Sequence, residues 1–334
     1  MKKITYSVLD LSMITKDGNA ATAIKRTVDL AQKAEELGYE RVWLAEHHNM
    51  EFIASSATSV LIGHVASQTK SIRVGSGGIM LPNHAPLAIA EQFGTLETLY
   101  PDRIDLGLGR APGTDQQTAM ALRRGDLNTA YQFPNDVVAL QTYFSESNRT
   151  ASVRAFPGEG LDIPIWILGS STDSAYLAAE MGLPYAFASH FAPKQFKIAT
   201  QIYRNNFRPS KSLDKPYVLA CVNGIAADSN EEAELLSMSL YQMFSGILTN
   251  SRKPLSPPIP NLLETWPQEL LDAVLPMTAC TFVGDKDTLI EKFSRFIEEH
   301  GVDELMITGN IFDNEKRLKS YSILAEVFNA INRS

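Results

Sequence analysis

The chain has 334 residues, of which 44% are hydrophobic and 20% are charged, an ordinary composition for a folded globular protein. This length accommodates two modest domains or one large α/β barrel. The 38 acidic and 30 basic side chains give a net charge of −8, and the basic residues form no run. A nucleic acid or an anionic membrane surface is therefore not an expected partner.

The two cysteines, Cys221 and Cys280, lack paired-thiol spacing, which is typical of a protein from a reducing compartment. The first residues, MKKITYSVLDLS, do not form the apolar core of a signal peptide. The sequence contains no run of about 18 apolar residues, so a membrane-spanning helix is not expected. We therefore expect a cytoplasmic protein that does not enter a membrane.

Strand-like and helix-like segments alternate from the start of the chain. Helix spacing is clear in the first helical segment, where Ile24, Val28 and Ala31 recur on one face and Gly38 provides a stop. In the first third of the chain we expect strands at 4–10, 41–46, 71–81 and 102–109, and helices at 20–38, 56–69 and 85–100.

The alternation continues after a longer section, 111–163, which contains two helical pieces and a stretch with glycine and proline. The segment 249–261 has too many prolines to continue a helix or to enter a sheet. The remaining expected strands are 164–170, 184–189, 217–227 and 302–309, and the remaining helices are 172–182, 193–207, 230–248, 286–300 and 313–332.

Eight strands, each followed by helical sequence, predict a parallel sheet. Eight such units fit a (β/α)8 TIM barrel as one domain over 1–334, with insertions after strands four and seven. A doubly wound open sheet of eight strands is the competing fold.

In a (β/α)8 barrel, catalytic residues lie on the loops that follow the strands. Strand two runs into Glu46, His47, His48 and Asn49, and strand four runs into Gly109 and Arg110. Strand six ends in Ser189 and His190, and strand eight in Thr308, Gly309 and Asn310. We therefore expect a ring of polar groups at the barrel mouth.

The segment LGSSTDSAYLAAE is the clearest candidate for phosphate binding. A strand meets a helix at Gly169, Ser170 and Ser171, and Ser174 lies in the first helical turn. Free backbone N–H groups and hydroxyls at a helix start favour an anion. Alternatively, Ser171 only caps the helix. The guanidinium of Arg110 also suits phosphate, unless it forms a surface ion pair, for example with Asp115.

The segment VGSGGIM places Gly75, Gly77 and Gly78 in or beside a strand, which indicates a bulge or the close approach of a flat group. It matches neither a P-loop nor a GxGxxG fingerprint. The six histidines show no HxH or HExxH spacing, and the adjacent His47 and His48 would point to opposite sides. A metal-dependent hydrolase is a weaker alternative. The sequence contains no GxSxG elbow, so a serine hydrolase is not expected.

The segments WLAEHHN, VGSGGIMLPNHAPLAIAEQF, RIDLGLGRAPGTD and GSSTDSAYLAAEMGLPYAFASHF, in this order, resemble the bacterial luciferase-like flavin monooxygenases, particularly the alkanal monooxygenase branch. The resemblance implies that reduced FMN binds at the barrel mouth. Arg110, the Ser170–Ser171 turn and Ser174 would hold its phosphate, and a cis peptide bond at Gly77–Gly78 would lie beside its isoalloxazine ring. His47 would be the catalytic histidine and Glu46 its acidic neighbour. The luciferase subunit has Glu where Ser170 stands.

The resemblance predicts that reduced FMN is a cosubstrate and that O2 supplies one oxygen atom to a small organic substrate, such as an aldehyde. A separate flavin reductase and a homodimer are expected by analogy. The segment 249–261 is a candidate lid, or else a static loop. The alternatives are an F420-dependent oxidoreductase of the same superfamily and a flavin-binding protein without turnover. The substrate itself is not predicted.

Overall fold

Eight parallel strands close into a barrel in the computed structural model, which describes residues 3–333. The ring closes because β10 pairs with both β1 and β8. The predicted (β/α)8 barrel is therefore confirmed, and the open sheet is wrong. The barrel strands are β1 (Thr5–Asp10), β2 (Arg41–Leu44), β3 (Arg73–Ser76), β5 (Ile104–Gly109), β6 (Ile165–Gly169), β7 (Tyr185–Phe187), β8 (Val218–Ala226) and β10 (Glu304–Thr308).

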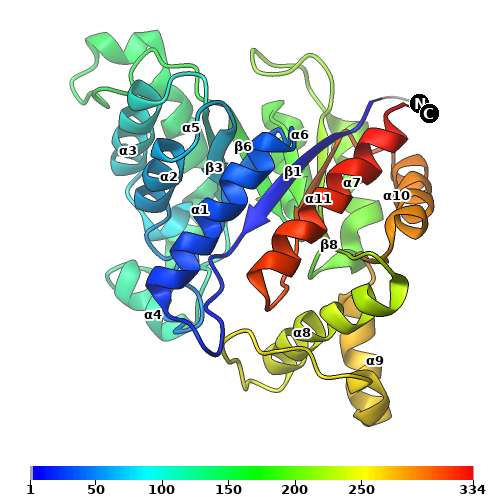
Figure 1. The fold of residues 1–334 in the computed structure, drawn as a ribbon. Coiled ribbons are helices and arrows are strands. Elements are labelled where there is room, and N and C mark those ends of the chain that lie inside the picture. Colours follow the sequence, from blue (N-terminus) through cyan, green and yellow to red (C-terminus); the bar gives the residue numbers. More distant parts are fainter. Residues whose placement is uncertain (1–2, 334) are drawn as a thin grey trace.

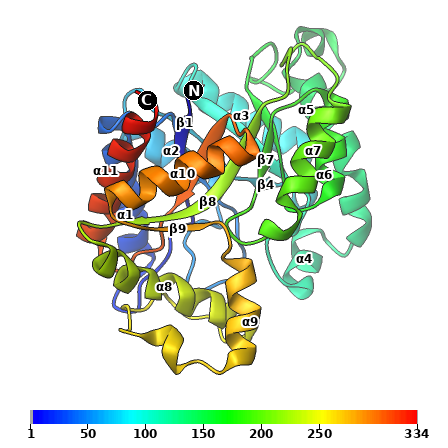
Figure 2. The same cartoon turned by 90° about the vertical axis from the view of Figure 1, so that its right-hand side faces the viewer.

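The helices surround the barrel, as Figures 1 and 2 show from two sides. Helix α1 begins at a capping box formed by Asn19 and Thr22, and it ends before Gly38, which has a positive φ of 78°. The helices are α1 (Ala20–Glu36), α2 (Thr58–Ser67), α3 (Pro86–Leu99), α4 (Gln116–Leu122), α5 (Phe133–Phe144), α6 (Thr172–Met181), α7 (Phe196–Asn206), α8 (Asn230–Leu248), α9 (Gln268–Met277), α10 (Lys286–His300) and α11 (Asn314–Ile331). None of the helices within residues 3–333 is both long and apolar enough to cross a membrane.

The third expected strand, 71–81, is not continuous. It divides into β3 and the short strand β4 (Ile79–Met80), both of which pair with β5. A cis peptide bond at Gly77–Gly78 lies at the division. The cis bond expected from the resemblance is thus present in this chain.

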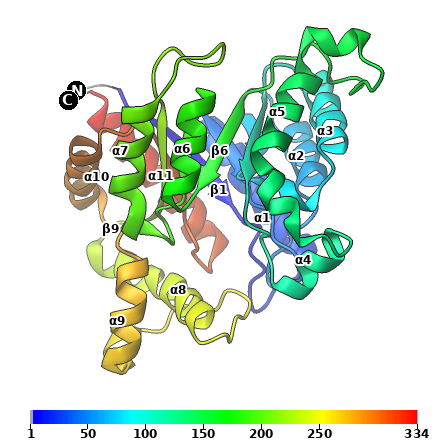
Figure 3. The same cartoon turned by 180° about the vertical axis from the view of Figure 1, so that it is seen from behind.

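The predicted insertion after the seventh barrel strand contains two elements that the sequence did not reveal. Helix α9 and strand β9 (Thr281–Gly284) lie in the region 262–285. The first residues of β8 pair with β7, whereas Asn223 to Ala226 pair with β9. Figures 1 and 3 show α8 and α9 at the same end of the barrel as α4, beyond the carboxyl ends of the strands.

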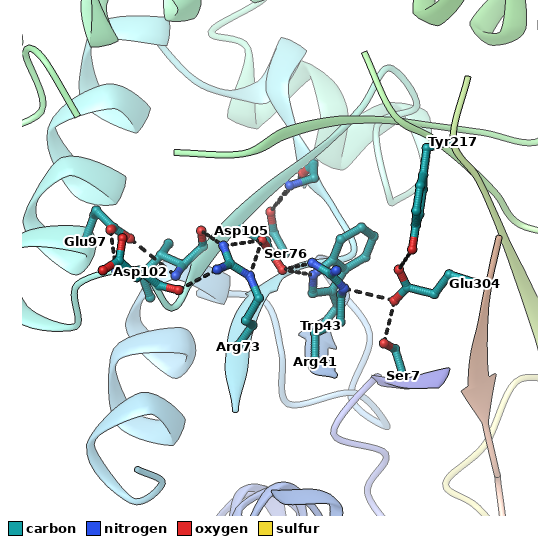
Figure 4. A network of polar contacts seen from close by, with 12 residues as sticks. Ser7, Arg41, Trp43, Arg73, Ser76, Glu97, Asp102, Asp105, Tyr217 and Glu304 are labelled. Atoms are coloured by element: carbon teal, nitrogen blue, oxygen red, sulfur yellow. Dashed lines mark hydrogen bonds and ion pairs between the residues drawn. The ribbon is translucent and has the colours of Figure 1, made fainter. Parts of the chain in front are cut away.

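A buried ionic network closes the opposite end of the barrel (Figure 4). Asp105 accepts hydrogen bonds from Arg41 Nη1 (2.6 Å), Trp43 Nε1 (3.1 Å) and Arg73 Nη2 (2.7 Å). Arg41 Nε also donates to Glu304 Oε1 at 2.9 Å. These side chains belong to four different strands, so the network ties β2, β3, β5 and β10 together below the mouth.

Candidate functional site

A cavity of about 600 Å³ lies at the carboxyl end of the barrel. Its volume is typical of small-molecule sites. Each of the eight barrel strands, or the loop that follows it, contributes to the wall, as the sequence predicted for the barrel mouth. Polar wall residues include His47, Arg110, Ser170, Ser171, His190, Asn223, Thr308 and Asn310.

The cavity brings together most of the residues expected to bind or act on a ligand. His47, Gly77, Arg110, Gly169, Ser170, Ser171 and Ser174 all line it. Gly78 is joined to the lining residue Gly77 by the cis bond. Glu46 is not part of the wall.

Glu46 lies behind the wall and is almost fully buried. Its Oε1 accepts from His48 Nε2 at 2.8 Å and from His84 Nε2 at 2.9 Å, and its Oε2 accepts from the Met80 backbone N–H at 3.1 Å. Burial alone would raise the pKa of Glu46, but these hydrogen bonds hold it at about 2. A carboxylate that is charged at neutral pH thus links the loop after β2 to β4 and to the segment that follows β4.

The group formed by Glu46, His48 and His84 is also the candidate metal cluster found among the described residues, with potential ligand atoms within 4.8 Å of one another. Both imidazoles already donate to the carboxylate, so the contacts are satisfied without an ion. The opposite orientation expected for His47 and His48 is confirmed, because His47 lines the cavity and His48 contacts Glu46. His84 was missed, since nothing in its spacing connects it to Glu46.

The imidazole of His47 is held at the cavity wall by Gly113, whose carbonyl oxygen lies 3.3 Å from Nδ1. Because a carbonyl only accepts, Nδ1 carries the hydrogen and Nε2 keeps its lone pair. Burial lowers the pKa of His47, and the nearby charge of Arg252 acts in the same direction. His47 is therefore a neutral potential base near pH 7.

The glycines of the VGSGGIM segment allow close packing of backbone at the cavity. A Cβ atom at Gly77 would lie 2.7 Å from Leu9 Cδ1, and one at Gly78 would lie 2.7 Å from the carbonyl oxygen of Gly107. The obstacle at Gly78 is backbone, so a side chain is excluded there, whereas the obstacle at Gly77 is the end of the flexible Leu9 side chain. Because Gly77 lines the cavity, the cis bond lies at the cavity wall.

The start of α6 has the features expected of an anion site. Ser171 occupies the N-cap position, but its side chain makes no capping hydrogen bond. The first helical N–H groups lack intrahelical acceptors, and that of Thr172 donates to Gln195 Oε1 at 3.2 Å. The Ser174 hydroxyl donates to the Ser171 carbonyl (2.8 Å) and lies 2.9 Å from the Tyr185 hydroxyl.

Arg110 lies at the same helix start. Its Nη2 donates to Asp173 Oδ2 at 3.1 Å, and both side chains are more than half exposed. The alternative partner considered from sequence, Asp115, instead caps α4 by accepting from the Thr118 N–H at 3.0 Å. An exposed ion pair of this kind is weak and exchanges readily for a stronger anion.

Of the other wall residues, His190 was expected at the end of the sixth strand, whereas Asn223 and the apolar residues of α8 and α9 were not singled out from the sequence. Asn223, on β8, donates to the His190 carbonyl oxygen at 2.7 Å, while its own Oδ1 is buried without a partner among the described residues. Burial lowers the pKa of His190 to about 3, so this imidazole is neutral. Met243, Phe244, Ile247 and Met277 add an apolar wall from α8 and α9.

The proline-rich segment 249–261 crosses the rim of this cavity, to which it contributes Arg252 and Lys253. It is anchored at Leu255, whose N–H donates to the Ile14 carbonyl (2.9 Å) and whose carbonyl accepts from the Lys16 N–H (2.8 Å). Its role as a lid stays a prediction, and any movement of the segment must keep or break this anchor.

The (β/α)8 barrel has at its mouth a cavity that contains cations and a histidine, with a cis Gly–Gly bond beside it. This architecture is typical of an enzyme. The family profile described as "Luciferase-like monooxygenase" matches residues 4–304. The chain belongs to the luciferase-like monooxygenase family, which supports a monooxygenase as its class of enzyme.

The alignments to two relatives cover nearly the whole chain. It is 49% identical over 326 residues to "Luciferase-like monooxygenase" of Escherichia coli strain K12, covering 98% of this chain and 97% of the relative. It is 32% identical to "N-acetyl-S-alkylcysteine monooxygenase" of Bacillus subtilis strain 168, covering 99% and 100%.

Solved structures share the same fold. The crystal structure of apo-MsnO8 superposes with a TM-score of 0.87 at 30% identity and covers 98% of both chains. At 18% identity, 3,6-diketocamphane monooxygenase in complex with FMN has a TM-score of 0.71, and at 13% an F420-dependent secondary alcohol dehydrogenase has the same score. The last two likenesses concern the fold alone.

Proposed function

We propose that the protein is an FMN-dependent monooxygenase that uses reduced flavin and O2 to oxygenate a small organic molecule. The observation that carries the proposal is the convergence of His47, Gly77, Arg110 and the start of α6 on one cavity. The name of the Bacillus subtilis relative supports oxygenation of a small organic substrate.

The wall fits FMN at both of its ends. Arg110, the Ser170 and Ser171 hydroxyls and the N–H groups at the start of α6 would form a phosphate site with a favourable helix dipole. The bare backbone of Gly77 and Gly78 would face the flat ring. Ser174 belongs to the same group, although its hydroxyl is already used within the turn.

When bound in reduced form, FMN supplies the two electrons that let one atom of O2 enter the substrate while the other leaves as water. His47, neutral and with Nε2 free, accepts or returns a proton near the reacting atoms. Glu46 lies behind the cavity wall, where its carboxylate holds the loop that carries His47 against strand β4 through the N–H of Met80. The apolar wall from α8 and α9 excludes water from the cavity.

The cofactor is tested by spectral titration of the purified protein with FMN, riboflavin and F420. We expect the wild type to bind FMN. The Arg110→Ala substitution should lower the affinity for FMN about tenfold, which is the contribution of one partly exposed charged hydrogen bond. Riboflavin lacks the phosphate, so its affinity should not change. Arg149→Ala, which removes another exposed, ion-paired arginine, is the matched control.

Turnover is tested by oxygen uptake with reduced FMN and a panel of aldehydes, thioethers and acids. Preferential binding of F420 would replace the proposal with the hydride-transfer alternative. FMN binding without substrate-dependent oxygen uptake would favour the non-catalytic alternative. A separate reductase, a homodimer and a cytoplasmic location stay predictions of the same proposal.

A further inference from the structure

The cavity carries a charge opposite to that of the whole protein. The chain has a net charge of −8, yet the cavity wall contains Arg110, Arg252 and Lys253 and no aspartate or glutamate. An apolar-walled cleft with charges of one sign concentrates ligands of the other sign. The cavity is therefore suited to anions at more than one point.

The three cations belong to two separate places. Arg110 lies at the start of α6 and already pairs with Asp173. Arg252 and Lys253 follow α8, and Arg252 Nη1 lies 4.0 Å from Met50 Sδ, in the loop after β2 that also carries His47. Neither Arg252 nor Lys253 forms an ion pair with any residue that the structure describes. These two cations are thus available to a ligand.

The segment that carries the free pair is held in place next to an apolar surface. The anchor at Leu255, which is only 3% exposed, lies two residues after Lys253. The same cavity wall includes an apolar surface, which consists of Met50, Phe52, Ile53, Met243, Phe244 and Ile247. A pair of positive charges next to such a surface matches a molecule with one anionic end and a hydrocarbon body.

We propose that the substrate is an amphipathic organic acid, whose carboxylate or sulfonate binds Arg252 and Lys253 and whose hydrocarbon body packs on this apolar surface. The word substrate rests on the proposed function, whereas the binding site does not. On the proposed function, the phosphate of FMN would bind at Arg110, so cofactor and acid would use different cations.

The test compares binding of octanoate, octane-1-sulfonate, octanamide and octan-1-amine by titration calorimetry, with and without FMN. In the wild type we expect both acids to bind about five- to tenfold more tightly than the neutral amide, since two partly exposed cations each contribute modestly. The preference should shrink as salt is added. It should disappear in the double variant Arg252→Gln, Lys253→Gln.

Two further variants make the test independent of a general charge effect. Arg208→Gln with Lys211→Gln removes the same charge from an exposed site outside the cavity wall and should keep the preference. Arg252→Glu with Lys253→Glu should reverse it, so that octan-1-amine binds more tightly than octanoate.

The proposal is overturned if octanamide binds as tightly as octanoate, or if the Arg252→Gln, Lys253→Gln variant keeps the acid preference. A loss of FMN or F420 affinity in that variant, without a change in acid preference, would assign the two cations to the cofactor and likewise overturn it. A protein that prefers acids but binds no flavin would refute the proposed function while the acid site stands.

Discussion

The Nδ1 atom of His47 lies 3.3 Å from the carbonyl oxygen of Gly113, although the two residues are 66 positions apart. Gly113 has a positive φ of 65°, and a Cβ atom there would lie 2.7 Å from the carbonyl oxygen of Glu46. The insertion after β5 therefore packs against the loop after β2 and orients the histidine. It leaves Nε2 as the only basic nitrogen of the ring.

Replacement of His47 by Gln should lower substrate oxygenation about 100-fold or more, because it removes a general base without emptying the site. The pKa of His47 is lowered from 6.5, so the neutral base is populated above that lowered value and lost as the pH falls through it. The wild-type kcat/KM should be flat near pH 7 and fall on the acid side below 6.5. This limb should be absent in the variant.

FMN affinity serves as the check on folding for His47→Gln, and His64→Gln, which changes an exposed histidine of α2, is the control. An unaltered acid limb in His47→Gln would mean that another group titrates.

Gly169→Ala should weaken FMN binding about tenfold or more, because the new Cβ would overlap the Oγ and Cβ of Ser174 and push the α6 turn out of place. Spectral titration with FMN measures this loss. Gly63→Ala is the control, since its Cβ would meet only the Leu96 side chain, at 3.2 Å. Equal FMN affinity in both variants would show that the phosphate is held elsewhere.

Glu46→Gln should reduce the free energy of unfolding at pH 7 by about 1–3 kcal/mol, because the buried amide replaces a charged acceptor of three hydrogen bonds. The folded pKa of about 2 is depressed, so this stabilisation is present above the unfolded pKa and declines as the pH falls toward 2. Urea unfolding at pH 7 and near pH 3 measures the change.

The difference between wild type and Glu46→Gln should therefore be smaller at the lower pH. The exposed neighbour Glu51, changed to Gln, should show no such difference. A constant difference at both pH values would contradict the depressed pKa.

Asp105→Asn should destabilise the barrel by about 3–5 kcal/mol, because Arg41 and Arg73 would lose their shared buried counter-charge. Asp173→Asn breaks an exposed ion pair and should cost less than about 1 kcal/mol. Urea unfolding compares the two. The fraction of Asp105→Asn that stays folded should bind FMN normally, because Asp105 is not part of the cavity wall.

Local signals predicted most of the fold. The apolar runs of the barrel strands, the helix spacing and stops such as Gly38 depend only on neighbouring residues, and they placed all eight barrel strands within a few positions. Two elements, β9 and α9, were not predicted because their local sequence patterns are weak. Strand β9 is four residues long, and α9 follows Pro267 and contains Pro276, so neither has a clear pattern.

The sequence by itself determined the order of strands and helices and the polar character of the strand ends, because periodicity and turn chemistry act over a few residues. Only the tertiary structure decided which of those polar groups share a cavity. His47 lines the wall while the adjacent Glu46 turns away to His48 and His84, and Arg252 reaches the same wall from a distant segment. These placements depend on how the closed barrel brings its loops together, which no local pattern records.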